Sequence, residues 1–201
     1  MGVEIEKKFL VKCLPKDLDK YPYHVIEQGY LNVFPAIRVR HEDDVYYMTY
    51  KGDIENSSTH VNPTEHSADG SCKDGNRAND AAGKIGKTEY NMPLDKASYE
   101  HMVSKADGNM IRKLRYLIPL NMDAYTIEYL DKRPEIARMM ENGDIKIELD
   151  VFDDPFKGNI LAEVEFPDED AAGNYIPPQW FGEEVTGNHR YSNAYMSTVR
   201  L

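Results

Sequence analysis

Apolar and charged residues alternate along most of this chain, in short segments separated by turn-forming residues. Residues 3–11 place Glu4, Glu6 and Lys8 on one side and apolar residues on the other, with Lys7 breaking the apolar side. A period of two is typical of β-strands, because successive side chains point to opposite faces of a sheet. The same pattern recurs at about 24–34, 36–41, 45–51, 87–92, 110–118, 145–152 and 159–166. The chain is therefore predicted to form seven or eight strands, the first four as an antiparallel meander.

Three segments have helical patterns instead. Pro93 precedes the stretch 95–106, where Asp95 can cap a helix and apolar residues recur at helical spacing. Residues 133–142 predict a short helix that ends at Gly143, and the residues from Ser192 onward predict a terminal helix. The expected fold class is α+β, mostly β, with a few peripheral helices.

Residues at about 53–84 interrupt this pattern with Asn, Ser, Thr, Asp, Gly and Ala, and with few large apolar side chains. Such a composition cannot build a core, so we interpret the segment as a polar loop insertion. The length of 201 residues and the 41% hydrophobic content suit one domain, 1–201, that carries this insertion.

The overall charge limits the classes of partner. Lys and Arg number 24 against 35 Asp and Glu, a formal net charge of −11. Nucleic acid and anionic membranes both need a surplus of bases on an outer face, so neither is an expected partner. The N-terminus lacks the apolar core of a signal peptide, and no apolar run approaches the roughly 20 residues that span a bilayer. We expect a cytoplasmic protein. The sequence does not distinguish a monomer from a homodimer.

The acidic excess is concentrated in one part of the chain. Residues 141–184 contain 13 acidic residues and two lysines, and the remainder of the chain is neutral. Within the predicted strands, whole faces carry one sign. These faces are Arg38 with Arg40, Lys113 with Arg115, Glu148 with Asp150, and Glu163 with Glu165.

Two arrangements explain such faces. Each could be a solvated sheet surface, or the sheet could be closed or nearly closed around a polar interior. In the second case, a basic wall would bind a polyanion and an acidic wall would bind Mg²⁺ or Mn²⁺. The six histidines, among them His24, have no metal-ligand spacing and are interpreted as surface or core residues. Cys13 and Cys72 are interpreted as structural or surface thiols.

The run Glu4-Ile5-Glu6-Lys7-Lys8, followed in order by these basic and acidic pairs, resembles the CYTH superfamily, also called the triphosphate tunnel metalloenzymes. The resemblance extends from residue 3 to about 195 and ends in a segment, 184–193, that is similar to the close of bacterial members. It implies an eight-stranded antiparallel tunnel barrel, closed or nearly closed, whose charged lumen binds a triphosphate group.

The resemblance also implies roles for residues at matching positions. The metal-binding acids would be Glu4, Glu6, Glu163 and Glu165. The phosphate-binding bases would be Lys8, Arg38, Arg40, Lys51, Lys113 and Arg115, with Arg190 as an addition near the C-terminus. Glu89 and Asp150 match acids that bind metal or position water, so we count them as catalytic together with Lys8. Whether Lys87 and Glu148 line the tunnel is left open.

The activity expected on this basis is that of a divalent-metal-dependent phosphohydrolase, which cleaves inorganic triphosphate or a small organic triphosphate with water as the nucleophile. Mg²⁺ or Mn²⁺ would be the cofactor and a small polyanion the partner. Two alternatives stay open: an adenylyl cyclase that makes cyclic AMP and pyrophosphate from ATP, and a non-catalytic module that binds polyphosphate or nucleotides.

Overall fold

The computed structural model of the protein describes residues 3–52 and 86–201, with the backbone alone for 3–4 and 86–88. The predicted insertion at about 53–84 lies outside the described residues. The strands are β1 (Val3–Val11), β2 (Tyr23–Val33), β3 (Ala36–Glu42), β4 (Val45–Gly52), β5 (Gly86–Leu94), β6 (Asp107–Pro119), β7 (Lys146–Phe152), β8 (Ile160–Phe166) and β9 (Phe181–Glu184).

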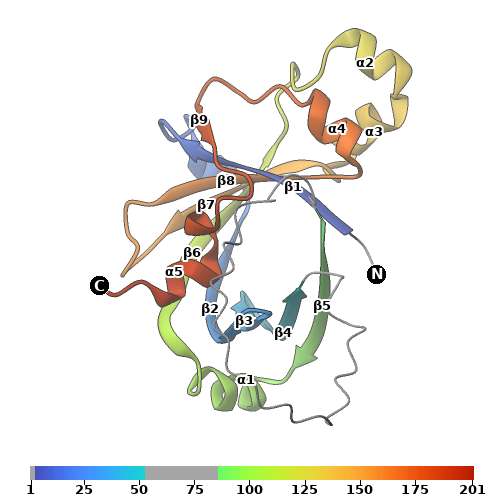
Figure 1. Ribbon diagram of the computed structural model, residues 1–201. Coiled ribbons are helices and arrows are strands. Elements are labelled where there is room, and N and C mark those ends of the chain that lie inside the picture. The colour runs from blue at the N-terminus through green and yellow to red at the C-terminus, as the bar shows by residue number, and fades with distance from the viewer. Residues whose placement is uncertain (1–2, 53–85) are drawn as a thin grey trace, which may run out of the picture.

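The strands form one antiparallel sheet in the order β5-β4-β3-β2-β6-β7-β8-β1-β9. At one end of this order, β5 also pairs with β1, where Val3, Glu4 and Ile5 lie opposite Thr88, Lys87 and Gly86. Figure 1 shows β2, β3, β4 and β5 curving away from the layer made by β1, β7 and β8. The mostly-β antiparallel architecture that the sequence predicts is confirmed.

One strand was not expected. The sequence predicts at most eight strands, whereas the part of the chain that the structure describes contains nine. The additional strand, β9, pairs with the end of β1, where Phe9 lies opposite Glu184 and Val11 opposite Phe181. It has only four residues, which is too short for an alternating pattern to be recognised.

Five helices accompany the sheet in the described part of the chain. They are α1 (Lys96–Val103), α2 (Ile127–Lys132), α3 (Pro134–Asn142), α4 (Glu169–Asn174) and α5 (Asn193–Thr198), with short 3-10 turns η1 (Leu18–Lys20) and η3 (His189–Tyr191). The three predicted helices correspond to α1, α3 and α5. Asp95 caps α1 by accepting a hydrogen bond of 2.7 Å from the backbone nitrogen of Ser98, and α3 ends at Gly143 with a φ of 75°. Among residues 3–52 and 86–201, no helix has both the length and the apolar character needed to cross a membrane.

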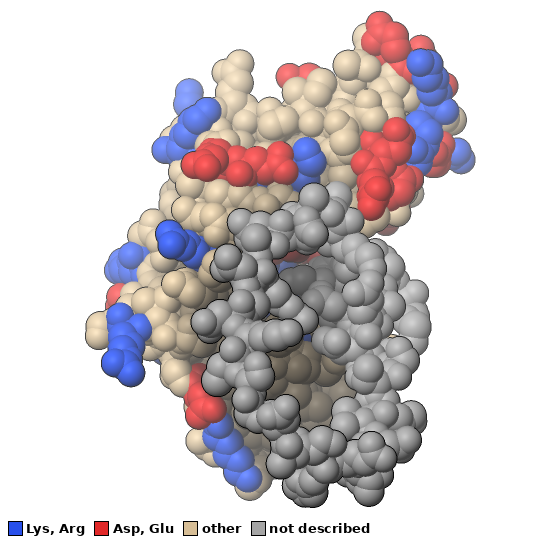
Figure 2. All heavy atoms as spheres, in the orientation of Figure 1, with Lys and Arg blue, Asp and Glu red and all other residues tan. Residues whose placement is uncertain are grey.

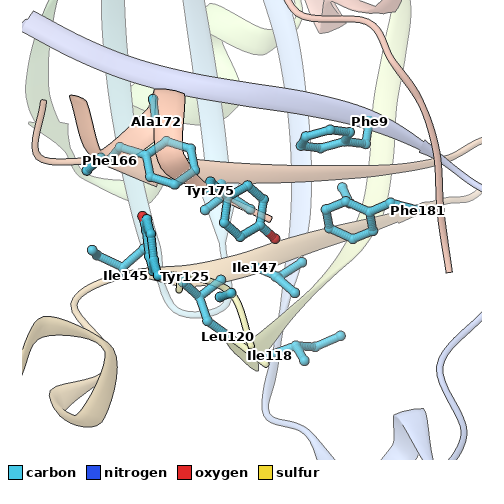
Figure 3. Close-up of a cluster of buried hydrophobic side chains, with 14 of the residues drawn as sticks. Phe9, Ile118, Leu120, Tyr125, Ile145, Ile147, Phe166, Ala172, Tyr175 and Phe181 are labelled. Carbon is cyan, nitrogen blue, oxygen red and sulfur yellow. The ribbon is translucent and has the colours of Figure 1, made fainter. Parts of the chain in front are cut away.

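The main hydrophobic core lies on the outer face of β1, β7 and β8. Figure 3 shows Phe9, Ile147, Phe166 and Tyr175 packed together between these strands and the helices. These side chains alternate along their strands with the charged residues. The outer face is covered by α4 and neighbouring segments, so its apolar side chains are buried away from water. The charged side chains are therefore directed to the other face of the sheet.

A second cluster fills one end of that inner face. Ile111, Phe152 and Leu161 lie two residues away from Lys113, Asp150 and Glu163 along their strands, so they share the inner face. They pack with Met196 of α5, while Tyr191 and Ala194 lie alongside. The inner face thus changes from charged to apolar along each strand, and the C-terminal segment covers the apolar end.

Gly29 is expected to tolerate no larger residue. A Cβ atom on Gly29 would lie 2.7 Å from the Cβ of Ala106 and 2.9 Å from the sulfur of Met110. Gly29→Ala should therefore lower the free energy of unfolding by about 1–3 kcal/mol, measured by urea denaturation. Gly173→Ala is the matched control, because a Cβ there meets nothing within 4 Å. Equal stability of the two variants would contradict the packing described here.

Candidate active site

A cavity of about 550 Å³ lies on the inner face of the sheet, and each of β1 to β8 contributes at least one residue to its wall. Nine of the residues proposed from the sequence line it: Glu6, Lys8, Arg38, Arg40, Lys51, Glu89, Arg115, Glu163 and Glu165. On the visible outer surface, Figure 2 shows Lys and Arg intermixed with Asp and Glu, most clearly around the helices at the top. In the cavity, the arginines of β3 and the glutamates of β8 form groups of one sign, whereas β1 contributes both Glu6 and Lys8.

Arg40 anchors the basic wall on β3. Its Nε donates to Gln28 Oε1 at 2.8 Å, and one terminal nitrogen donates to the Tyr47 hydroxyl at 3.0 Å. The same nitrogen lies 3.3 Å from Glu42 Oε2, which in turn accepts a bond of 2.6 Å from Tyr47. Burial, and then the nearby Arg38 charge, lower the pKa of Arg40. These bonds hold the guanidinium in one orientation on the wall.

Arg38 is less completely paired. One terminal nitrogen lies 3.6 Å from Glu89 Oε1, and Lys51 Nζ lies 3.7 Å from the other oxygen of Glu89. The Nε of Arg38 is buried without a hydrogen-bond partner. A buried donor without a partner is costly, and most such groups in native proteins meet a partner or a ligand. A charged donor in this position, on a cavity wall, is suited to an anionic ligand.

The acidic wall is set by the register of β1 and β8. Glu6 lies directly opposite Glu165, and Lys8 lies opposite Glu163. Lys8 Nζ is 2.8 Å from Glu163 Oε1 and 3.9 Å from Glu6 Oε1. Burial alone would lower the pKa of Lys8, but the carboxylates of Glu163 and Glu6 outweigh it and raise that pKa. Two like charges directly opposite each other destabilise a sheet unless a cation lies between them.

Arg115 connects the acidic wall to the strands beneath it. Its Nε donates to one carboxylate oxygen of Asp150, and one terminal nitrogen donates to the other, each at 2.7 Å. The same terminal nitrogen also donates to Glu163 at 2.7 Å. The other terminal nitrogen pairs with Glu148. Three carboxylates thus share one guanidinium.

Lys113 and Asp150, both proposed from the sequence as site residues, do not line the cavity. They are buried beneath its wall with 2% and 1% of their surface exposed, and they form an ion pair with each other. Burial and the neighbouring Arg115 lower the pKa of Lys113 to about 8, against the opposing effect of Asp150. Lys113 Nζ also lies over the ring of Phe152, 5.5 Å from its centroid.

Opposing charges also control the protonation of the buried acids. Burial by itself would raise the pKa of Glu163, but Lys8 and Arg115 hold it well below its usual range. Arg115 and Lys113 likewise outweigh burial and lower the pKa of Asp150. Both acids are therefore carboxylates at neutral pH, as an ion-paired network requires.

Two further proposed residues are not placed at the cavity. Arg190 is an exposed residue of η3 outside the cavity wall, although its neighbour His189 lies on that wall. The backbone of Glu4 lies in β1 opposite Lys87, and the side chains of both residues lie outside the described part of the chain.

Several wall residues were not proposed from the sequence. They are His24, Glu42, Tyr47, Thr49, Lys146 and His189, together with Glu148, whose position had been left open. The spacing of two residues from Arg38 and Arg40 could have identified Glu42. For His24 the sequence contains no such signal, because its position depends on the pairing of β2 with β6.

A preformed metal centre is not found within residues 3–52 and 86–201, since no three His, Cys, Asp or Glu residues there are arranged to hold an ion. Glu6 and Glu165 are the carboxylates best suited to receive one, because they face the cavity from opposing strand positions. Oxygen donors of this kind suit hard divalent cations.

Comparisons with known proteins agree with this geometry. No family model matches the chain. The inorganic triphosphatase of Nitrosomonas europaea is 30% identical over 195 residues, covering 94% of this chain and 93% of that protein. The inorganic triphosphatase of Acetivibrio thermocellus is 29% identical, covering 96% and 92%. The crystal structure of the inorganic triphosphatase NE1496 matches with a TM-score of 0.58 and 27% identity, over 100% of this chain and 97% of that one. With its inner walls of opposite charge and this near full-length similarity, the chain belongs to the family of these inorganic triphosphatases, within the CYTH superfamily of triphosphate tunnel metalloenzymes.

Proposed function

We propose that this protein hydrolyses inorganic triphosphate, or a small organic triphosphate, inside the cavity and with a divalent metal ion. The observation that carries the proposal is the cavity itself, in which Arg38, Arg40 and Lys51 face an acidic wall at Glu6 and Glu165. A triphosphate needs several cations around it, and Arg offers paired donors for phosphate oxygens. The names of the two curated relatives support the same activity.

The roles of the wall residues follow from their contacts. Arg38, Arg40, Lys51 and Arg115 would bind phosphate oxygens, and Lys8 would do so between its two carboxylate neighbours. Glu89 lies between Arg38 and Lys51. It would therefore be next to the bound substrate and would position the attacking water. Water attacks a terminal phosphorus, the bridging P–O bond breaks, and phosphate and pyrophosphate are released.

The buried pair takes a different role from the one that the family resemblance implies. Lys113 and Asp150 would act as positioning residues, because Asp150 accepts two bonds from Arg115 and so fixes the direction of that guanidinium. Neither residue reaches the cavity wall. Arg190 would have no contact with substrate held in the cavity.

Mg²⁺ or Mn²⁺ would be held by Glu6 and Glu165, with Glu4 as a further candidate on the same face of β1. When bound, such an ion would neutralise charge on the phosphate oxygens and so favour the attack of water on phosphorus. Its presence would also relieve the repulsion between the two opposed glutamates. We further infer that the strands close into a tunnel, which the pairing of β5 with β1 supports.

A panel of substrates tests the activity. Phosphate release from tripolyphosphate, pyrophosphate, longer polyphosphate, thiamine triphosphate and ATP would be measured with Mg²⁺ and with Mn²⁺. Tripolyphosphate is expected to be turned over fastest. Cyclic AMP formed from ATP would indicate the cyclase alternative, and binding without turnover would indicate a non-catalytic module.

Arg38→Ala is expected to raise KM for tripolyphosphate roughly tenfold or more, because a charge-assisted hydrogen bond contributes about 1.5–3 kcal/mol. Initial rates over a range of substrate concentrations measure this change. Arg138→Ala, at an exposed position of α3, is the matched control and should leave KM unchanged. An unchanged KM in Arg38→Ala would remove Arg38 from the binding site.

A further inference from the structure

His24 lies on the cavity wall beside Arg115. Along β2, Gln28 lies opposite Arg40, and the side chains two and four residues earlier, Ile26 and His24, point to the same face. On β6, the Cα partner of His24 is Arg115. The imidazole lines the cavity and is 37% exposed, so it is accessible both to a ligand and to solvent at this end.

Asp43, in the turn between β3 and β4, fixes the orientation of this ring. Its Oδ2 lies 2.6 Å from His24 Nδ1, and its Oδ1 accepts a bond of 2.8 Å from the backbone nitrogen of Val25. Its own backbone nitrogen donates to the Val25 carbonyl oxygen at 3.0 Å. Asp43 has a φ of 50°, in the left-handed region that side-chain-bearing residues seldom adopt. Three contacts to β2 thus hold a turn residue in an uncommon conformation.

The chemistry of the ring follows from this orientation. Because Asp43 takes Nδ1, Nε2 is the ring nitrogen that can meet a ligand, and in an imidazolium both nitrogens donate. The groups that face the ring are Asp43, Glu42 at 4.0 Å and the neighbouring Arg115. Glu42 is itself engaged by Tyr47. An anionic oxygen would therefore be a suitable partner for Nε2.

We propose that His24 is a substrate-binding residue that contacts the terminal phosphate group at the end of the cavity near the β3–β4 turn. This inference rests on the proposed function. Arg115 is the Cα partner of His24, and Arg40 contacts Glu42 beside the ring. A phosphate group held at this end of the cavity would therefore meet His24 together with these two arginines.

His24→Ala tests the proposal. KM for tripolyphosphate is expected to rise about tenfold, as for loss of one charge-assisted hydrogen bond. The inhibition constant of pyrophosphate, used as a competing ligand, should rise as well. His24→Gln, which keeps a neutral donor and a similar volume, should fall between the wild type and His24→Ala. The control is His101→Ala, at an exposed position of α1, which should change neither constant.

Asp43→Gly separates the orientation of the ring from the fold of the turn. Glycine accepts a positive φ without strain, so this change removes the carboxylate while keeping the turn. Introduced alone, Asp43→Gly should raise KM for tripolyphosphate about threefold. Introduced into His24→Ala, it should cause no further rise in KM, because the effects of coupled residues are not additive. An active wild type with an unchanged KM in His24→Ala would overturn the inference. A wild type with no turnover would instead overturn the proposed function.

Discussion

Arg115→Ala is expected to lower the free energy of unfolding by about 3–5 kcal/mol, which would be a large part of the stability of a domain this size. The guanidinium is the shared partner of Asp150, Glu148 and Glu163. Removing it leaves three carboxylates close together, of which Asp150 is buried with 1% of its surface exposed. Asp150 would keep Lys113 and Glu163 would keep Lys8, but a buried carboxylate that loses part of its pairing costs far more than a lost surface contact. Urea denaturation monitored by circular dichroism measures the change.

Arg112→Ala on the same strand is the matched control. Arg112 pairs with Glu27 at 2.7 Å, but the side chains are 49% and 34% exposed. Water and salt screen such a pair, so its loss should cost less than about 1 kcal/mol. If the two variants lose equal stability, the Arg115 network contributes no more than a surface ion pair. Arg115→Lys should restore only part of the loss, since an ammonium group lacks the planar fork that holds Asp150 by two bonds.

Glu6→Gln is expected to lower metal-stimulated phosphate release roughly 10²- to 10³-fold, because a divalent ion contributes several kcal/mol to the transition state. The amide keeps the size of the side chain but loses the negative charge opposite Glu165. Stability should change by less than about 1 kcal/mol, because Glu6 is 30% exposed and lies 3.9 Å from Lys8. Rates at rising Mg²⁺ concentration distinguish weaker metal binding from a lost chemical step.

Glu184→Gln provides the control for this substitution. Glu184 pairs with Lys7 on the outer surface and is 42% exposed, so the same change there should leave both the rate and its metal dependence intact. Removal of metal with EDTA should abolish turnover in the wild type and in this control alike. Full activity of Glu6→Gln would contradict the assignment of the acidic wall to metal binding.

The two variants test different parts of one arrangement. Both residues line the cavity, but Arg115 also holds three carboxylates together, whereas Glu6 is proposed to bind the metal ion. A loss of stability with the first and a loss of activity with the second would show that the charged interior combines a structural layer and a binding layer. The sequence does not distinguish these layers, since Lys113 and Arg115 have the same spacing and sign as Arg38 and Arg40.

Much of the fold followed from the sequence by itself. The alternation around Glu6 and Lys8, or Glu163 and Glu165, predicted strands because a period of two puts one chemical type on each face. Helix ends were also predictable, since Asp95 and Gly143 act through local hydrogen bonds and local backbone conformation. Each of these signals lies within a few neighbouring residues, which is why it can be recognised before the fold is known.

Other features depended on contacts between distant residues. The depth of Lys113 beneath the wall results from its neighbours Phe152 and Asp150 on another strand. Similarly, His24 reaches the cavity only because β2 pairs with β6 and because the β3–β4 turn brings Asp43 to its ring. The sequence by itself thus determined which faces are charged and with which sign. Only the tertiary structure decided which of those charges reach the cavity and which are buried as ion pairs, because strand register and the packing of the C-terminal segment bring together residues that are far apart along the chain.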